Sequence, residues 1–273
     1  MSTHEHTGSV TAAVEDYAKA IYALQTQCGG AVSNNALAER LRVTPASASN
    51  MVKKLDQLGL VEHVPYRGVK LTKAGERVAL EVLRHHRLLE LYLAESLNVP
   101  WDRVHDEAEV LEHVLSEELE ELIAAKLGNP THDPHGDPIP TRELRIEEGH
   151  TTSMQALESG AAGTFVRISD TDPEMLRYLA ERGIAPGDEF EIVDKQPFEG
   201  PISARFGEKV LVLGGKLARA MRAEVEGGRS PSGHARPEVR SSEAGGRATT
   251  SDAGPDGPRR STNQDAGLDA PRG

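Results

Sequence analysis

Histidine and carboxylate side chains recur at helical spacing in the middle of this chain. His86 and Glu90 are four residues apart, so in a helix they share one face. The next expected helix repeats this chemistry at spacings of four, three and one, in His105, Glu109, Glu112 and His113. Imidazole nitrogens and carboxylate oxygens are the ligands that hard and borderline divalent cations prefer. The pattern therefore favours a metal site where two helices meet.

The alternative is that the acidic run from Asp102 to Glu121 is only a solvated helix face. We keep this interpretation for four of its glutamates: Glu117, Glu118, Glu120 and Glu121. A second group of polar residues lies in a Pro-rich loop: His132, Asp133, His135 and Asp137. We interpret these residues as turn formers whose side chains hydrogen-bond the local backbone. Four further histidines are expected to be solvated: His4, His6, His150 and His234. The sequence contains no G-x-S-x-G nucleophile motif and no P-loop.

The metal-binding pattern follows a segment that predicts helices and then a hairpin. Apolar residues at helical spacing predict helices over residues 14–24, 34–41 and 45–58. The period then changes to two in LVEHVPYRGVKLT, which predicts a β-hairpin that turns at Tyr66-Arg67-Gly68. Thr72 can cap a long helix over residues 73–97, and a helix pair follows over 104–115 and 116–126.

Helix, turn, helix and hairpin is the order of a winged helix-turn-helix, whose second helix enters the major groove of DNA. Its N-terminal end here carries Thr44, Pro45, Ala46, Ser47, Ser49 and Asn50. Asn50 can hydrogen-bond a base edge, whereas Lys53 and Lys54 supply charge toward phosphates. Arg67 and Lys70 in the wing complete the positive footprint. These residues predict DNA binding, and a winged-helix scaffold that contacts protein is the alternative.

Charge is segregated along the 273 residues, whose net charge is −12. Residues 1–75 carry 8 Lys or Arg against 6 Asp or Glu, while residues 76–130 carry 5 against 13. Only the first segment is suited to phosphate. The single Cys28 suits a reducing compartment, and neither a signal peptide nor a transmembrane stretch is evident. We therefore expect a cytoplasmic protein with no membrane partner.

The second half of the chain predicts mainly strands instead of helices. Four Pro and two Gly in residues 128–140 predict a loop over residues 128–146. Strand-like segments follow at 163–169, 189–194, 202–206 and 209–213, and residues 216–225 look like a closing helix. Together they have the size of a small SH3-like β-barrel. From residue 226 only Val239 and Leu268 are large and apolar, which predicts a disordered tail.

The chain contains EDYAKAIYAL, then the winged helix, then LRHHRLLE, VHDEAEVLEHVLS and HGDPIP, and then an SH3-like module. This combination resembles the diphtheria-toxin-repressor family of metal-dependent transcriptional repressors. The resemblance covers roughly residues 13–225. It implies a homodimer that binds palindromic double-stranded operators near metal-uptake genes. It also implies that Mn(II) or Fe(II) acts as corepressor, with two ions per subunit.

The resemblance further implies which residues bind metal. His86, Glu90 and His105 match one site, and Glu112 and His113, with Asp16 and Glu109, match the second. Asp16 and Glu109 stand where manganese-responsive members have carboxylates, whereas Lys19 departs from that pattern, which has Glu there. His105 is more typical of iron-responsive members, so the chain is a hybrid. The SH3-like module would lend Asp172 to the first site, with Glu174 as a substitute, since Met175 cannot replace an amide oxygen.

The expected fold class is mainly α with small β parts, arranged as three domains and a tail. Residues 1–73 form the winged helix-turn-helix, 74–146 the helical metal-binding and dimerisation domain, 147–225 the SH3-like (FeoA-like) domain, and 226–273 the disordered tail. The function expected is a DNA-binding repressor and not an enzyme. Two alternatives are a metal-assisted hydrolase with the same ligands and a winged-helix sensor of an organic ligand. The first lacks a separate general base, and the second leaves the His and Glu stripe unexplained.

Overall fold

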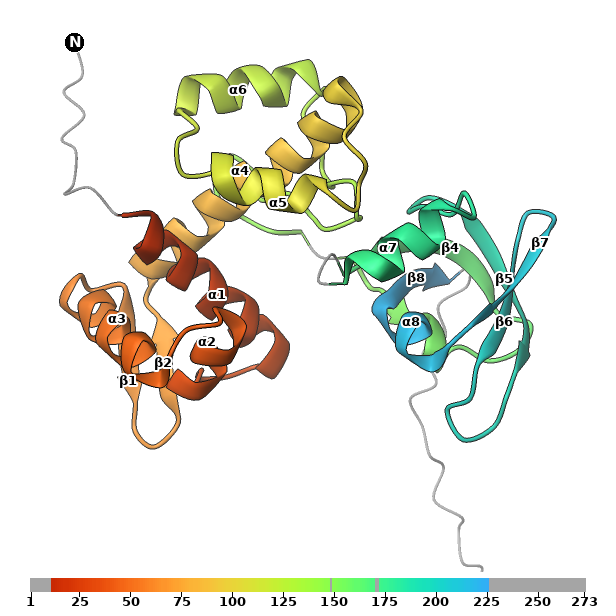
Figure 1. Ribbon diagram of the computed structural model, residues 1–273, viewed down its shortest axis with the longest axis horizontal. Coiled ribbons are helices and arrows are strands. Elements are labelled where there is room, and N and C mark those ends of the chain that lie inside the picture. Colours follow the sequence, from red (N-terminus) through yellow and green to blue (C-terminus); the bar gives the residue numbers. More distant parts are fainter. Residues whose placement is uncertain (1–10, 148, 170–171, 226–273) are drawn as a thin grey trace, which may run out of the picture. The chain divides into compact units, whose positions relative to one another are not determined.

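The computed structural model describes residues 11–147, 149–169 and 172–225 (Figure 1). Helices dominate the first part and one antiparallel sheet dominates the last, which confirms the expected fold class. The tail from residue 226, and with it His234, lies outside the described residues, as do His4 and His6. No described helix is both long and apolar enough to cross a membrane.

The N-terminal part contains three helices and a hairpin in the predicted order. They are α1 (Ala12–Cys28), α2 (Asn34–Arg40), α3 (Pro45–Gln57), β1 (Val61–Val64) and β2 (Gly68–Leu71). Ser33 and Thr44 cap α2 and α3 by accepting from backbone N–H groups in the first turn. Ile21, Leu37 and Leu55 are fully buried between the helices. Their packing fixes α3 with its N-terminal end at the surface.

A backbone bridge ties the hairpin to the helices. Val32 and Val69 exchange two backbone hydrogen bonds, of 2.8 and 2.9 Å. The chain enters β2 at Gly68, where φ is +114° and an added Cβ would lie 2.0 Å from the carbonyl oxygen of Val32. Only glycine fits this conformation and this close approach. The wing is therefore held against the connection between α1 and α2.

The long helix α4 (Lys73–Leu97) begins and ends where the sequence predicts, and Thr72 caps it by accepting from Gly75 N at 3.2 Å. The two helices after it are α5 (Val104–Leu111) and α6 (Glu117–Lys126). The first is shorter than predicted, because the chain turns at residues 112–114 before Ser116 caps α6. This turn carries two candidate metal ligands.

The C-terminal part is a six-stranded antiparallel sheet in the order β3-β8-β4-β5-β6-β7, with short helices around it. Its elements are β3 (Thr152–Ser153), the 3-10 turn Met154–Ala156, β4 (Ala162–Ile168), α7 (Pro173–Ala180), β5 (Glu189–Lys195), β6 (Ile202–Phe206), β7 (Lys209–Leu213), α8 (Gly215–Ala220) and β8 (Met221–Val225). Its core contains Phe165, Ile192 and Leu213.

The helix expected over residues 216–225 is wrong in its second half. The helix α8 ends at Ala220, and β8 pairs with both β3 and β4. Met221 and Ala223 are buried while Glu224 is exposed, so the side chains alternate with the period of a strand. The sequence reasoning also missed α7.

Candidate metal centre

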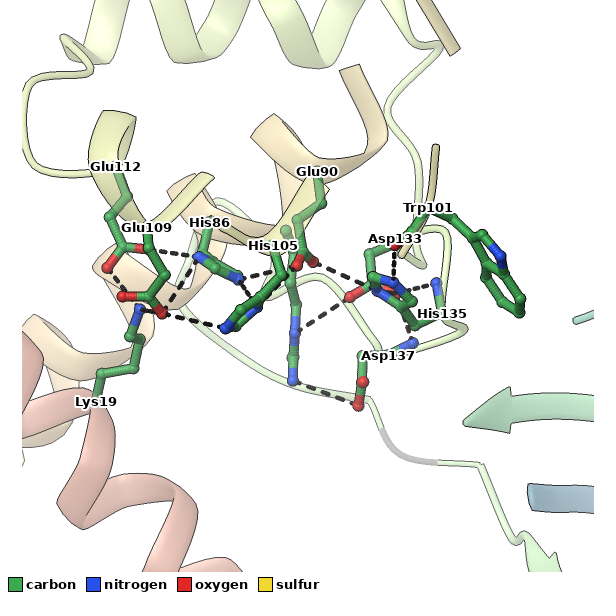
Figure 2. Close-up of polar contacts among 11 residues, drawn as sticks. Lys19, His86, Glu90, Trp101, His105, Glu109, Glu112, Asp133, His135 and Asp137 are labelled. Carbon is green, nitrogen blue, oxygen red and sulfur yellow. Dashed lines mark hydrogen bonds and ion pairs between the residues drawn. The ribbon is translucent and has the colours of Figure 1, made fainter. Parts of the chain in front are cut away.

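Most of the metal-ligating side chains predicted from the sequence lie close together, and Figure 2 shows five of them: His86, Glu90, His105, Glu109 and Glu112. Among the described residues, three groups of His, Asp and Glu have ligand atoms within 4.8 Å of one another. They are His86, His105 and Glu109; Asp16, Glu112 and His113; and Glu90, Asp133 and His135. The first two groups contain only predicted ligands, whereas the third contains two residues that the sequence reasoning assigned to a turn.

The first group lies between α4 and α5. Glu90 Oε1 is 3.0 Å from His86 Nε2 and 3.2 Å from His105 Nδ1, and Glu109 Oε1 is 3.7 Å from His105 Nε2. Burial alone would lower the pKa of His86, but Glu90 and Glu112 outweigh it and raise that pKa to about 9. Glu109, which the resemblance assigned to the other site, thus lies with His86 and His105. Two imidazoles and two carboxylates could hold one divalent ion here.

The second group joins α1 to the turn after α5. His113 Nε2 lies 2.9 Å from Asp16 Oδ1 and 3.5 Å from Glu112 Oε1. The other ring nitrogen of His113 lies 2.6 Å from Glu15 Oε2. When a carboxylate accepts a hydrogen bond from one ring nitrogen of a histidine, it orients the other ring nitrogen toward a metal. Glu15 is a supporting residue that the sequence reasoning missed, although its position beside Asp16 was a signal.

The third group corrects the turn interpretation of the Pro-rich loop. Asp133 Oδ1 does accept from the backbone N–H groups of His135 and Asp137, at 2.8 and 2.9 Å. The His135 ring is fully buried, however, and its Nε2 lies 2.8 Å from the carbonyl oxygen of Trp101. Trp101 also stacks on this ring. Turn formation does not explain a buried imidazole that is held from both sides.

The Nδ1 atom of His135 is the most informative atom of this group. It is buried and has no hydrogen-bond partner among the described residues. Glu90 Oε2 lies 3.7 Å from it and Asp133 Oδ1 lies 4.0 Å from it. These separations are too long for hydrogen bonds but suit ligands that share one ion at roughly 2.1–2.2 Å. The donor set therefore fits a divalent cation.

The charges of the third group support this fit. Burial and the neighbouring Glu90 raise the pKa of Asp133 well above its ordinary value. Burial would lower the pKa of His135, but Glu90 and Asp133 raise it to about 9. Arg87 lies 3.8 Å from Asp133 and balances part of the negative charge. The buried carboxylates thus favour a positive charge beside them. When no metal is bound, the protonated imidazole of His135 supplies this charge.

Lys19 is a cation inside the cluster. Its Nζ lies 2.6 Å from both Glu109 Oε1 and Glu112 Oε1. Burial disfavours the ammonium form, but the carboxylates of Glu112 and Glu109 more than offset this effect and raise the pKa of Lys19. Lysine stands here at a position where the manganese-responsive pattern has Glu, and it places a positive charge between two candidate ligands.

The expectation that four glutamates of the acidic run are only solvated is wrong for Glu120. Its side chain is 12% exposed, accepts from Arg84 Nε at 2.5 Å and lies 2.9 Å from His85 Nε2. It thereby joins α6 to α4. The other three are exposed, as expected: Glu117, Glu118 and Glu121.

The structure does not bring Asp172 into any of the three groups found among the described residues. This carboxylate caps α7 by accepting from Glu174 N at 3.2 Å. Its other oxygen lies 2.8 Å from Lys216 Nζ. Met175 packs against the core of the β-sheet part. A role for Asp172 in metal binding stays a prediction.

The predicted DNA-facing residues lie at the N-terminal end of α3, farther along α3 at Lys53 and Lys54, and in the wing. Most are exposed: Thr44, Pro45, Ala46, Ser47, Asn50, Lys53, Lys54 and Arg67. Ser49 is half-buried and accepts from Asn34 Nδ2, and Thr44 caps the helix, so these two also have structural roles. Tyr66 at the wing tip is fully exposed and was not selected from the sequence.

Family models match three consecutive parts of the chain. The "Iron dependent repressor, N-terminal DNA binding domain" matches residues 9–69, the "Iron dependent repressor, metal binding and dimerisation domain" matches 72–141, and the "FeoA domain" matches 152–225. The "Iron-dependent repressor IdeR" of Mycobacterium leprae (strain TN) is 37% identical over 224 residues, which cover 77% of this chain and 96% of that protein. The chain belongs to the diphtheria-toxin-repressor family. The resemblance seen in the sequence is confirmed.

Solved structures of similar proteins agree with this membership. A "Manganese-dependent transcriptional repressor complex with manganese" is 41% identical, with a TM-score of 0.72, and covers 78% of this chain and 99% of that one. The "Crystal structure of T. acidophilum IdeR" is 27% identical, with a TM-score of 0.65, and the match covers 80% of this chain and 99% of that one. These relatives of the diphtheria-toxin-repressor family are transcriptional repressors and not enzymes, which argues against the hydrolase alternative.

Proposed function

We propose that this member of the diphtheria-toxin-repressor family is a DNA-binding transcriptional repressor that requires Mn(II) or Fe(II) as corepressor. The observation that carries the proposal is the second ligand group, in which Asp16 belongs to α1 and Glu112 and His113 follow α5. An ion held there would join the helix that supports the winged helix-turn-helix to the helical domain. Because its target would be chromosomal DNA near metal-uptake genes, we propose that it acts in the cytoplasm.

Two ions per subunit would suit the ligands. One would be held by Asp16, Glu112 and His113, and the other by Glu90 with the imidazoles around it. An ion supplies positive charge that neutralises buried carboxylates and fixes their positions. The ligands are oxygen and imidazole nitrogen with no sulfur, and such sets suit Mn(II) and Fe(II) better than softer ions.

The proposed mechanism is a shift of population. When the sites are empty, carboxylates near α1 repel one another, and α1 has more freedom relative to α5. Metal binding would favour the arrangement in which two recognition helices enter successive major grooves of a palindromic operator. Operator and metal must then strengthen each other's binding equally.

The proposal includes the domain limits expected from the sequence. Residues 1–73 would form the DNA-binding domain, residues 74–146 the metal-binding and dimerisation domain, and residues 147–225 the SH3-like domain.

A homodimer is needed for a palindromic operator, and the helical domain offers a surface for it. Large apolar side chains are exposed on α5, α6 and the turn between them: Val110, Leu111, Val114, Leu119 and Leu122. Contiguous exposed apolar residues mark protein interfaces. We propose that this surface is the dimer interface, in agreement with the dimerisation domain that matches residues 72–141.

The experiment that tests the function is a mobility shift with DNA from upstream of the protein's own coding region. Mn(II), Fe(II), Zn(II) and a chelator are compared in parallel, under anaerobic conditions. We expect a retarded complex with Mn(II) or Fe(II) that the chelator abolishes. Equal binding with metal and with chelator would contradict the proposal.

Asn50→Ala should relax the sequence preference, whereas Lys53→Ala should weaken binding to all sequences. Both side chains are exposed on α3, but only the amide can read a base edge, while the ammonium can contact phosphate. Losing one phosphate contact should lower the slope of log affinity against log salt by about one unit. Titrations of operator and random duplex at several salt concentrations measure both effects. Equal slopes and unchanged preference would reject the proposed placement of α3.

His135→Gln should reduce the Mn(II) bound from two ions per subunit to one. His135 supplies the buried nitrogen that faces Glu90 and Asp133, and an amide cannot replace an imidazole in this position. The matched control is His132→Gln, because His132 is exposed in the same loop. Metal analysis after equilibrium dialysis gives the stoichiometry. Two ions in the His135 variant would exclude this group as a metal site.

A further inference from the structure

Lys19 occupies the point where the first two ligand groups meet (Figure 2). It extends from α1, and its Nζ lies 2.6 Å from one oxygen of Glu109 and 2.6 Å from one oxygen of Glu112. The side chain is only 16% exposed. One ammonium group therefore bridges two carboxylates that belong to different groups.

Each of the two oxygens that Lys19 contacts also faces an imidazole of the candidate ligands. Glu109 Oε1 lies 3.7 Å from His105 Nε2 and 3.9 Å from His86 Nδ1. Glu112 Oε1 lies 3.5 Å from His113 Nε2, within the second group. A divalent ion bound through either of these oxygens would have to share it with the ammonium or displace the ammonium. Two cations at such short range repel each other strongly.

The contacts of Lys19 also join the elements that a metal ion would join. Lys19 lies one helical turn from Asp16 on α1, and both of its partners belong to α5 or the turn that follows it. The side chain of Glu112 is fully buried, so a positive charge beside it offsets a large desolvation cost. The ammonium thus supplies both the charge and the link between α1 and α5.

We propose that Lys19 is a tethered cation that stands in for one divalent ion, holding α1 against α5 before metal binds and competing with metal for Glu109 and Glu112. The inference rests on the proposed function, because it concerns regulation of the same site. Two consequences follow. The metal-free protein keeps α1 partly docked, and the metal concentration needed for full occupancy is higher than the ligand set alone would give.

The test compares Lys19→Met with Lys19→Arg in the full-length, chelator-treated protein. Methionine keeps the length of the side chain without its charge, and arginine keeps the charge. Lys73→Met is a matched control, because Lys73 is exposed at the start of α4. Calorimetric titration with Mn(II) measures affinity and stoichiometry. Hydrogen exchange of residues 12–28, in chelator and in Mn(II), measures the docking of α1.

In Lys19→Met we expect Mn(II) to bind at least about tenfold more tightly, since the competing charge is gone. Without metal we expect α1 to exchange at least about tenfold faster than in the unmodified protein, and Mn(II) should restore its protection. Lys19→Arg and Lys73→Met should resemble the unmodified protein in both measurements. Lys19→Gln, which is also neutral, repeats the test if the methionine variant does not fold.

Mn(II) affinity within twofold of the unmodified value, or unchanged exchange of α1, would overturn the role of Lys19. If the unmodified protein still binds Mn(II) and responds to it on DNA, only this inference fails and the proposed function stands. If neither the unmodified protein nor the neutral variants bind Mn(II), both fail. Binding that is restored only in the neutral variants would support competition by Lys19 and count against the corepressor function.

Discussion

Glu112→Gln is expected to abolish metal-stimulated operator binding while the chain stays folded. Glu112 takes part in three contacts at once: Oε2 lies 2.5 Å from His86 Nδ1, and Oε1 faces Lys19 and His113. Glutamine has the same size and keeps one acceptor oxygen, so the packing is preserved. It loses the negative charge, and with it a ligand that lies between the first two groups. We expect operator affinity in Mn(II) to fall more than about a hundredfold.

A mobility shift with and without Mn(II) measures this loss, and analytical ultracentrifugation shows whether the dimer persists. Glu118→Gln is the matched control, since Glu118 is an exposed glutamate of the same acidic run. The control should retain the full response to metal. If Glu112→Gln retained it as well, the assignment of Glu112 as a ligand would be wrong.

Much of the fold was predictable because its signals are local. The bounds of α4 follow from the Thr72 cap and from an apolar stripe that continues to Leu97. The wing follows from an alternating pattern on both sides of Gly68. The strand β8 was not predictable in this way, because residues 221–225 form a strand only through pairing with β3 and β4. Tertiary pairing overrides local propensity in such segments.

The ligands of the candidate site also fall into those that local spacing predicts and those that only the tertiary structure brings together. His86 with Glu90, and His105 with Glu109, were found because helical spacing places each pair on one face. His135 was missed because its partner Glu90 lies 45 residues earlier, and the local turn explained its neighbours. Lys19 was recognised as a departure from the family pattern, but its bridging of two carboxylates depends on how α1 packs against α5.

Mn(II) binding is expected to strengthen steeply as pH rises from 6.5 to 8.5. The pKa values of His86 and His135 are both about 9 in the metal-free protein, against an ordinary value of 6.5, so both imidazoles are protonated at neutral pH. A metal ligand must be deprotonated, and the ion held by Glu90 with these two imidazoles therefore displaces both protons. Each proton released should raise the affinity about tenfold per pH unit until the pH approaches the pKa.

The stability of the metal-free fold should change in the opposite direction. A pKa that is higher in the folded state than in the unfolded state stabilises the fold below about pH 6.5, and this contribution is lost as pH rises through about 9. Thermal unfolding in chelator should therefore occur at lower temperature at pH 8.5 than at pH 6.5. With saturating Mn(II) the difference should shrink or reverse, because tighter metal binding stabilises the folded state.

Calorimetric titration in buffers of different ionisation enthalpy counts the protons that Mn(II) releases. At pH 7.5, under anaerobic conditions, we expect close to two per subunit, one from each protonated imidazole. His135→Gln should abolish the release of both protons, because the ion held by Glu90 with His86 and His135 is lost, whereas His132→Gln should leave the count unchanged. A count near zero, with affinity that does not vary with pH, would mean that neither imidazole carries a proton before metal binds. The carboxylates around His86 and His135 would then need another cation, and two are at hand, since the Lys19 ammonium contacts Glu112 and the Arg87 guanidinium lies 3.8 Å from Asp133.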